Sequence, residues 1–215
     1  MVTSVVAYHE PNDMVWSAGG WIDGLTGLTW DHGKGQDLHA VMPPRDPDYV
    51  AACALMVRRD ILAGIGGLDP GYFIYFEDAE LGLRAKTHGY GVSVLEKPVV
   101  HHAAARRRGL RKDAVAKLFI FARSTLRFVL KNWPLSRMPA ALVAWVAFYT
   151  AVAASRGPRR YGPSVTRAVI WNLRHLEETK AARSQSRPVQ PPTQRFGELC
   201  AFLLRMAQHL ELFPY

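Results

Sequence analysis

The most constraining stretch of this 215-residue chain is YFIYFEDAE at residues 72–80, where four aromatic side chains run directly into three carboxylates. The preceding residues 66–71, GGLDPG, are typical of a turn, because glycine adopts positive φ freely and proline fixes φ. Residues 78–88 favour a helix that Gly89 would end. The pattern therefore predicts a cluster of acids in the first turn of a helix, immediately after an apolar loop.

The predicted helix has two distinct faces. Phe76, Ala79 and Leu83 follow a helical spacing and predict a buried stripe, whereas Glu77 and Glu80 would lie on a neighbouring face. Acids at a helix start also complement the positive end of the helix dipole. On their own they indicate a stable helix as readily as a catalytic site.

The segments before this helix predict sheet and turn structure. Residues 1–8 could form a short strand, and residues 49–57 are apolar and β-prone, which suits a strand buried on both faces. Asp60 would then N-cap a short helix that Gly66 ends.

A second predicted strand follows the central helix. Residues 90–100 are β-prone, and Pro98 indicates an edge or a bend. This strand would deliver His101 and His102 to its end, where α/β sheets usually gather ligands. Paired histidines at a strand end are otherwise an ordinary surface feature.

The order of these pieces carries a resemblance. The run from YVAACALMVRRD at residues 49–60, through YFIYFEDAE, to VVHH at residues 99–102 resembles the C-terminal half of the catalytic domain of inverting family-2 glycosyltransferases. It is particularly similar to bacterial rhamnosyltransferase and galactofuranosyltransferase-like members. WSAGG at residues 16–20 and FARSTLRF at residues 121–128 fit the same family, so the resemblance covers about residues 10 to 135.

The resemblance implies an α/β fold, the acceptor-side portion of a GT-A domain, and hexosyl transfer from a nucleotide sugar to a lipid-linked or polysaccharide acceptor. Asp78 matches the general base that takes the proton of the acceptor hydroxyl. Glu77 and Glu80 would orient it or bind acceptor hydroxyls. His102, or alternatively His101, matches the histidine that helps to hold a divalent cation, Mn²⁺ or Mg²⁺, with the donor diphosphate.

Further binding residues are expected around these. Trp16 lies in a glycine-rich, tryptophan-rich stretch and could stack on a sugar ring, although tryptophans more often belong to a core. Asp37 is a candidate acceptor-site hydrogen bonder. Arg106 and Arg107 belong to a basic run that could cover the donor diphosphate, contact lipid phosphate or simply be solvated.

One departure from the family concerns the metal motif. The first half of such domains binds the nucleotide and ends in Asp-x-Asp, and this sequence is expected to begin after that point. Residues 46–48, DPD, have the letters but lie in a proline-rich stretch, and we interpret them as a loop. The chain would then need an upstream or separately encoded nucleotide-binding half. The alternative is a non-catalytic fragment that binds a membrane or a partner chain.

The C-terminal part predicts membrane association. We divide the chain into residues 1–134, the GT-A-like portion; 135–183, apolar and basic helices; 184–194, a proline-rich linker; and 195–215, an amphipathic helix. A helix from Asp113 would carry Arg123, Arg127 and Lys131 on one basic face.

Residues 138–155 contain no charge and would reach about 27 Å as a helix, close to the roughly 30 Å of a bilayer core. They could span the membrane, but arginines on both sides favour a helix lying in its cytoplasmic face.

Net charge bounds the partners. The formal charge is +9, which suits anionic lipid, phosphate or nucleic acid. Nucleic-acid binding rests on charge alone and gives no reason for the aromatic and acidic stretch, so we expect no nucleic-acid partner. Cys53 and Cys200 lack the spacing of a disulfide framework or a metal site, which fits a reducing cytoplasm.

Overall fold

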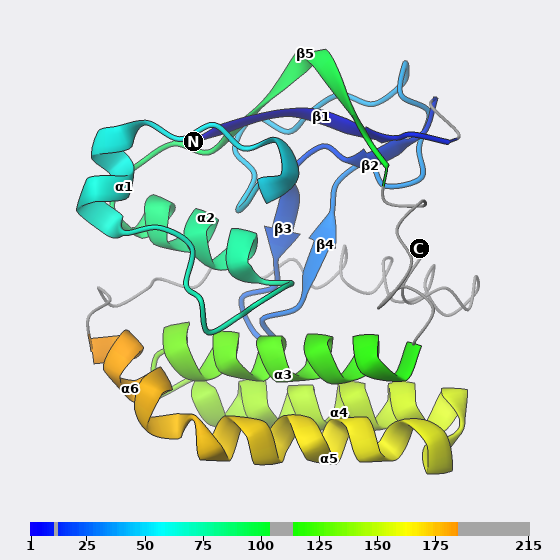
Figure 1. Cartoon of the computed structure of the whole chain (residues 1–215), viewed down its shortest axis with the longest axis vertical. Helices are drawn as coiled ribbons and strands as arrows, with labels where there is room; N and C mark the ends of the chain where they lie inside the picture. The colour runs from blue at the N-terminus through cyan, green and yellow to red at the C-terminus, as the bar shows by residue number, and fades with distance from the viewer. Residues whose placement is uncertain (11–12, 104–113, 185–215) are drawn as a thin grey trace.

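The structure, a computed structural model, describes residues 1–10, 13–103 and 114–184 (Figure 1). In these residues a small sheet with the strand order β2-β1-β5 lies at one end, and a layer of helices lies at the other. A two-stranded hairpin, β3 with β4, reaches from the sheet towards the helices. The strands are β1 (Val2–Tyr8), β2 (Val15–Ser17), β3 (Gly20–Ile22), β4 (Thr29–Asp31) and β5 (Ser93–His102). The α-helices are α1 (Arg59–Ile65), α2 (Glu77–Thr87), α3 (Ala114–Asn132), α4 (Met138–Arg156), α5 (Pro158–Arg174) and α6 (Leu176–Ser184). This arrangement confirms the mixed α/β class.

Strands β1 and β5 are parallel and confirm the two predicted strands. They end together, with Tyr8 paired to His102. The register shifts between Ser4 and Val6, so that residues 96–99 form an irregularity in β5, which arches away in Figure 1. Pro98 falls in this irregularity, on the edge strand of the described sheet, as expected for a residue that cannot donate a ladder hydrogen bond.

The predicted strand at residues 49–57 is wrong. This segment contains the short 3-10 helix η1 (Ala52–Ala54) and two isolated bridges, Tyr49 with Gly20 and Met56 with Val2. Its backbone thus joins the hairpin to the sheet instead of forming a continuous ladder. A short apolar run indicates burial but does not distinguish a strand from a buried connection.

The start of one helix also differs from the prediction. Asp60 does not cap α1: Arg58 is the N-cap, and its Nε donates to Asp60 Oδ1 at 3.0 Å. Gly66, with φ of 82°, ends α1 as predicted. The helices expected over residues 135–183 are α4, α5 and α6, and α5 and α6 are separated by a break at His175, whose ring stacks on Trp171 with centroids 4.0 Å apart.

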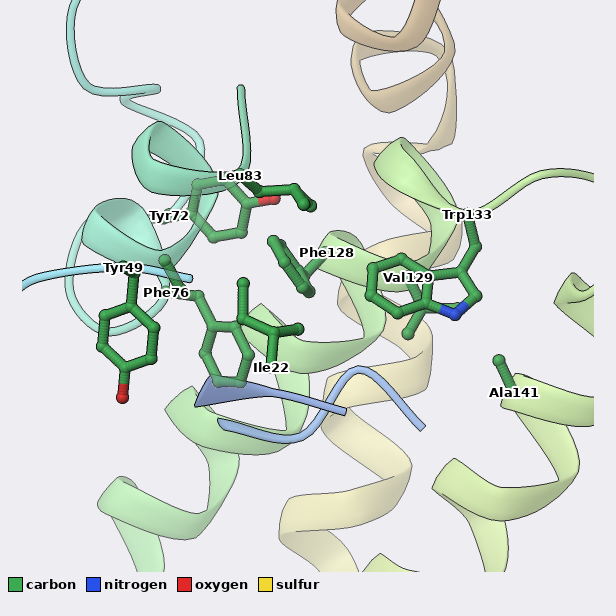
Figure 2. Packing of buried hydrophobic residues seen from close by; sticks show 10 residues of the cluster. Ile22, Tyr49, Tyr72, Phe76, Leu83, Phe128, Val129, Trp133 and Ala141 are labelled. Carbon is green, nitrogen blue, oxygen red and sulfur yellow. The ribbon is translucent and has the colours of Figure 1, made fainter. Parts of the chain in front are cut away.

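The main core forms where the hairpin, α2 and α3 meet (Figure 2). Phe76 of the predicted buried stripe is 5% exposed and packs against Phe128 of α3, with ring centroids 5.4 Å apart. Ala79 and Leu83 are also buried, which confirms the stripe. Trp133 extends this core beyond the end of α3, and its indole donates to Gly24 O at 3.1 Å. The core therefore fixes α2 against α3.

Helices α4 and α5 cover the side of α3 that faces away from α2 (Figure 1). Trp145 Nε1 of α4 donates to Ala122 O at 3.2 Å, and the Tyr149 hydroxyl lies 2.7 Å from Thr125 Oγ1. Within the described part of the chain, α4 alone is long and apolar enough to cross a membrane. The predicted linker at 184–194, apart from Ser184, and the amphipathic helix at 195–215 lie outside the described residues.

Candidate functional site

The loop before α2 has an unusual backbone. Phe73, Tyr75 and Phe76 have φ values of 64°, 64° and 74°, in the left-handed region that residues with side chains rarely adopt. Such conformations cost on the order of 1 to 3 kcal/mol each and persist only where the surroundings enforce them. Phe76 is also the N-cap of α2, so the strain lies immediately before Asp78.

Helix α3 holds this loop in place through rings and hydrogen bonds. The Tyr75 ring stacks on Phe121 with centroids 4.0 Å apart and planes inclined by 22°. The Arg123 guanidinium donates to Tyr72 O, and Ser124 Oγ donates to Ile74 O at 3.5 Å. Because these donors satisfy loop carbonyls directly, α3 determines the path of the loop.

Two carboxylates draw the cations of α3 into the interior. Lys131 Nζ lies 2.7 Å from Asp69 Oδ2 and 2.9 Å from Glu80 Oε1, and it therefore joins the loop to α2. Arg127 lies 3.2 Å from the same Asp69 oxygen. Burial raises the pKa of Asp69, but the hydrogen bond and charge of Lys131, with the Gly71 amide and the charge of Arg127, outweigh burial and hold that pKa below its ordinary value.

The predicted basic face of α3 is therefore not a free surface. Arg123, Arg127 and Lys131 are 8%, 3% and 5% exposed and face the loop and α2. The helical spacing is correct, but the fully buried Glu80 and the partly buried Asp69 require charged partners. The basic face serves the fold.

Glu80 occupies a structural position. Its side chain is fully buried. Arg84 donates to both of its oxygens, from Nε to Oε1 at 3.0 Å and from Nη2 to Oε2 at 2.7 Å. Arg84 also donates to Ile65 O and to Gly67 O, which ties the end of α1 to α2. This arrangement favours a role in holding α2 over contact with an acceptor.

Asp78 is half-buried in the first turn of α2. Its pKa is raised to about 7, mainly by burial and then by the negative charges of Glu77 and Asp31. The Ala79 amide donates to Asp78 Oδ1 at 2.8 Å and opposes the shift. A carboxyl group with this pKa exchanges its proton near neutral pH, which is the property a general base requires.

Glu77 adjoins this carboxyl group. Burial raises its pKa, and its Oε2 atom is buried with no hydrogen-bond partner among the described residues. An unsatisfied buried oxygen is unusual in a folded protein. Glu77 thus carries an unsatisfied acceptor next to Asp78.

A second group of polar residues, which was not predicted from the sequence, lies near Asp78. Asp31, at the end of β4, accepts a hydrogen bond from the Tyr49 hydroxyl at 3.3 Å and pairs with Lys34 Nζ at 3.1 Å. Burial lowers the pKa of Lys34, but the charge and hydrogen bond of Asp31, together with the nearby Tyr8 and Tyr75, outweigh burial, so that pKa is raised. The Asp-x-x-Lys spacing within WDHGK at residues 30–34 is the only local signal.

Tyr49 reaches Asp31 because two glycines make room for it. A Cβ atom at Gly20 would lie 2.2 Å from the Tyr49 ring, and one at Gly82 would lie 2.8 Å from Tyr49 Cα. Helix α2 and strand β3 therefore both approach Tyr49 closely. The glycines bring the start of α2, with Asp78, near Asp31.

The predicted Trp16 and His102 lie together at the carboxyl ends of β1 and β5. Their rings meet edge to face with centroids 4.8 Å apart. Lys34 Nζ lies 5.4 Å from the centre of the Trp16 ring, so this lysine connects the pair to Asp31. The structure thus brings Trp16, His102 and Asp31 into one chain of contacts through Lys34.

The remaining predicted residues are placed differently. His101 Nδ1 lies 3.3 Å from Tyr8 O at an exposed position. Asp37 is exposed, and its carboxylate accepts a hydrogen bond from the His39 amide at 2.7 Å, as in a local turn. Arg106 and Arg107 lie outside the described residues.

The described residues do not provide a complete set of ligands for the expected divalent cation. Within residues 1–10, 13–103 and 114–184, no three His, Cys, Asp or Glu side chains are grouped so that they could hold a metal ion. His101 and His102 are successive strand residues and point to opposite faces, so they do not converge on one ion. The described residues alone therefore do not fit Mn²⁺ or Mg²⁺.

Residues 46–48 form a loop, as predicted. Asp48 Oδ2 accepts a hydrogen bond from the Ile22 amide at 2.9 Å. Lys86 Nζ lies 3.1 Å from Asp46 and 3.4 Å from Asp48. These acids fix the hairpin to α2, and their partners are protein groups.

Comparison with known proteins indicates a relationship to glycosyltransferases. The chain is 33% identical over 86 residues to an N-acetylglucosaminyl-diphospho-decaprenol L-rhamnosyltransferase from two strains of Mycobacterium tuberculosis. The aligned part is 40% of this chain and 27% of the relative, so the chain spans about a quarter of the length of the curated relatives it matches. No family model matches the chain.

Substitution of Lys131 tests the ion network. Lys131→Met removes the cation that Asp69 and Glu80 share. Each carboxylate keeps an arginine partner, so we expect a loss of about 1.5 to 3 kcal/mol in the free energy of unfolding. Urea unfolding measures the change. Lys180→Met, which removes an exposed ion pair with Glu177, should cost less than about 1 kcal/mol. Equal effects of the two substitutions would contradict a structural role for Lys131.

Substitution of Asp78 tests its raised pKa without an activity assay. The folded pKa of about 7 exceeds the unfolded value of about 3.9, so ionisation of Asp78 destabilises the fold. This cost is complete above about pH 7 and disappears as the pH falls towards 4. Asp78→Asn should therefore have a free energy of unfolding about 1 to 3 kcal/mol larger than that of the wild type at pH 8, measured by urea unfolding. This gain should shrink at pH 4.5.

Asp60→Asn is the matched control. Its hydrogen bond with Arg58 lowers the pKa of exposed Asp60, so that substitution should not stabilise the fold at pH 8. A stability gain for Asp78→Asn that is the same at both pH values would show that the carboxyl group titrates normally.

Proposed function

We propose that the chain acts in inverting glycosyl transfer from a nucleotide-sugar donor to a lipid-linked or polysaccharide acceptor, with Asp78 as the general base. The pKa of Asp78, about 7, at the end of the strained aromatic loop is the observation that supports this most directly. The partial similarity to a rhamnosyltransferase supports the same class. That relative's name specifies N-acetylglucosaminyl-diphospho-decaprenol, and we propose an acceptor of the same lipid-linked kind.

The reaction follows from the position of Asp78. An acceptor hydroxyl donates a hydrogen bond to the ionised carboxylate, which takes the proton as the hydroxyl oxygen attacks the anomeric carbon. The bond between that carbon and the diphosphate oxygen breaks, and the nucleoside diphosphate leaves with the bonding electrons. Attack from the opposite side inverts the configuration.

The neighbouring residues receive complementary roles. Glu77, with its unpaired buried oxygen, would accept a second acceptor hydroxyl. Trp16 would contact a sugar ring, and Lys34 beside it would attract the departing diphosphate. Asp31 would act through Lys34 and through the charge it presents to Asp78.

The expected divalent cation stays a prediction, because its donor set is incomplete in the described residues. His102 is its candidate ligand, and Arg106 and Arg107 are candidate diphosphate contacts. We place the reaction at the cytoplasmic face of the cell membrane, where a lipid-linked acceptor presents its hydroxyl groups near the headgroups.

Donor turnover tests this proposal. The full chain with vesicles, Mn²⁺ or Mg²⁺ and a panel of nucleotide sugars should release nucleoside diphosphate, and kcat/KM should rise about tenfold per pH unit up to about pH 7 and then level off. Asp78→Asn should lower turnover by about 100-fold or more, because general-base catalysis contributes about that much. Asp60→Asn should leave it unchanged.

Two results would contradict the proposal. Turnover that survives in Asp78→Asn would exclude this residue as the base. A folded wild-type chain that releases nothing from any donor would favour the alternative of a non-catalytic chain that binds a membrane or a separate nucleotide-binding partner.

A further inference from the structure

The outer face of α4 is apolar and has no protein partner among the described residues. Val143 is 71% exposed and Val146 is 54% exposed. The exposed residues of this helix recur at helical spacing and carry no charge: Pro139, Ala140, Val143, Val146, Ala147, Thr150, Ala151, Ala154 and Ser155. A continuous exposed apolar face on a helix indicates an interaction surface.

The surroundings of this face are positively charged. From residue 114 to residue 176 the sequence contains no Asp or Glu. The cations of α3 are buried, but five arginines next to or within α4 and α5 are exposed: Arg137, Arg159, Arg160, Arg167 and Arg174. Exposed leucines accompany them, with Leu135 at 73% and Leu173 at 64%. Apolar groups among arginines, without acids, match the surface of an anionic bilayer.

The inner face of α4 restricts how the helix meets a membrane. Trp145 and Tyr149 pack into the cluster shared with α3 and α5 and hydrogen-bond to Ala122 and Thr125. A helix that crossed the bilayer would have to carry α3 and its buried Arg127 and Lys131 into the hydrocarbon, or break these contacts. A helix parallel to the surface keeps them all.

We propose that the outer face of α4 and the exposed arginines of α5 dock on an anionic phospholipid bilayer, with α4 lying in the plane of the interface. This docking surface does not depend on the transfer reaction. It lies on the opposite side of α3 from the aromatic loop, because Ala122 contacts α4 whereas Arg123 and Ser124 contact residues 72–74 (Figure 1). Docking would hold the Asp78 site about one helix diameter, roughly 10 Å, above the headgroups.

Vesicle flotation of the full chain tests the proposal. The wild type should bind phosphatidylglycerol-containing vesicles more strongly than phosphatidylcholine vesicles, and high salt should release it. Val143→Asp with Val146→Asp should lower binding by about tenfold or more, because two carboxylates would enter the apolar interface. Arg159→Gln with Arg160→Gln should weaken binding to the anionic vesicles by roughly fivefold per arginine.

The matched control introduces the same charge elsewhere. Met42→Asp with Met56→Asp changes two exposed methionines, 79% and 70% exposed, outside the docking surface and should bind like the wild type. Urea unfolding checks that every variant folds.

Three results would overturn the proposal. The first is unchanged binding of the Val143→Asp, Val146→Asp variant. The second is wild-type protein that neither high salt nor alkaline carbonate releases, which indicates a spanning helix. The third is a dimer in light scattering that this double variant dissociates without any change in vesicle binding, which indicates a second copy on this face.

Discussion

The structure depends on one buried ammonium group, that of Lys131, placed between Asp69 and Glu80. Asp69 belongs to the turn that opens the aromatic loop, and Glu80 belongs to the helix that follows it. Lys131 therefore fixes both ends of the segment that carries Asp78. Buried ions require partners at close range, and this requirement favours the arrangement in which Lys131 contacts both carboxylates.

The network supports a strained loop, and the loop supports the candidate base. Three consecutive or nearly consecutive aromatic residues hold positive φ values that a free chain would avoid. Rings from α3 and hydrogen bonds to Tyr72 and Ile74 enforce these conformations. The result places the Asp78 carboxyl group in a poorly solvated position beside Glu77 and near Asp31, where ionisation is disfavoured. The fold thus accepts a loss of stability and keeps the pKa of Asp78 near neutral pH.

Local sequence signals predict the elements that carry the site, but not the contacts between them. The turn at residues 66–71, the first turn of α2 and its end at Gly89 follow from the conformational preferences of glycine and from helical spacing. The partners of Arg127 and Lys131 cannot be predicted in this way, since Asp69 lies 58 residues before Arg127 and Glu80 lies 51 residues before Lys131. The basic spacing looks the same whether a helix faces lipid or buried acids.

Asp31 and Lys34 show the same limit for the site. The two residues are three apart, but their relation to Asp78 exists only because Gly20 and Gly82 allow Tyr49 to bring the hairpin close to α2. The strand predicted at residues 49–57 is wrong for a related reason, because only Tyr49, Val50 and Ala51 are buried and the segment forms isolated bridges instead of a ladder. The charge-free stretch of α4, by contrast, can be identified from the sequence. Only the structure shows which face of this helix packs against α3 and α5.

The fold holds Asp78 as a carboxylic acid that ionises near neutral pH. A carboxyl-carbon NMR titration of Asp78, assigned by its loss in Asp78→Asn, measures this directly. We expect a midpoint near pH 7 in the wild type and a lower midpoint in Asp31→Asn, which removes one neighbouring negative charge. A wild-type midpoint at about pH 4, the ordinary value of an aspartate, would contradict it.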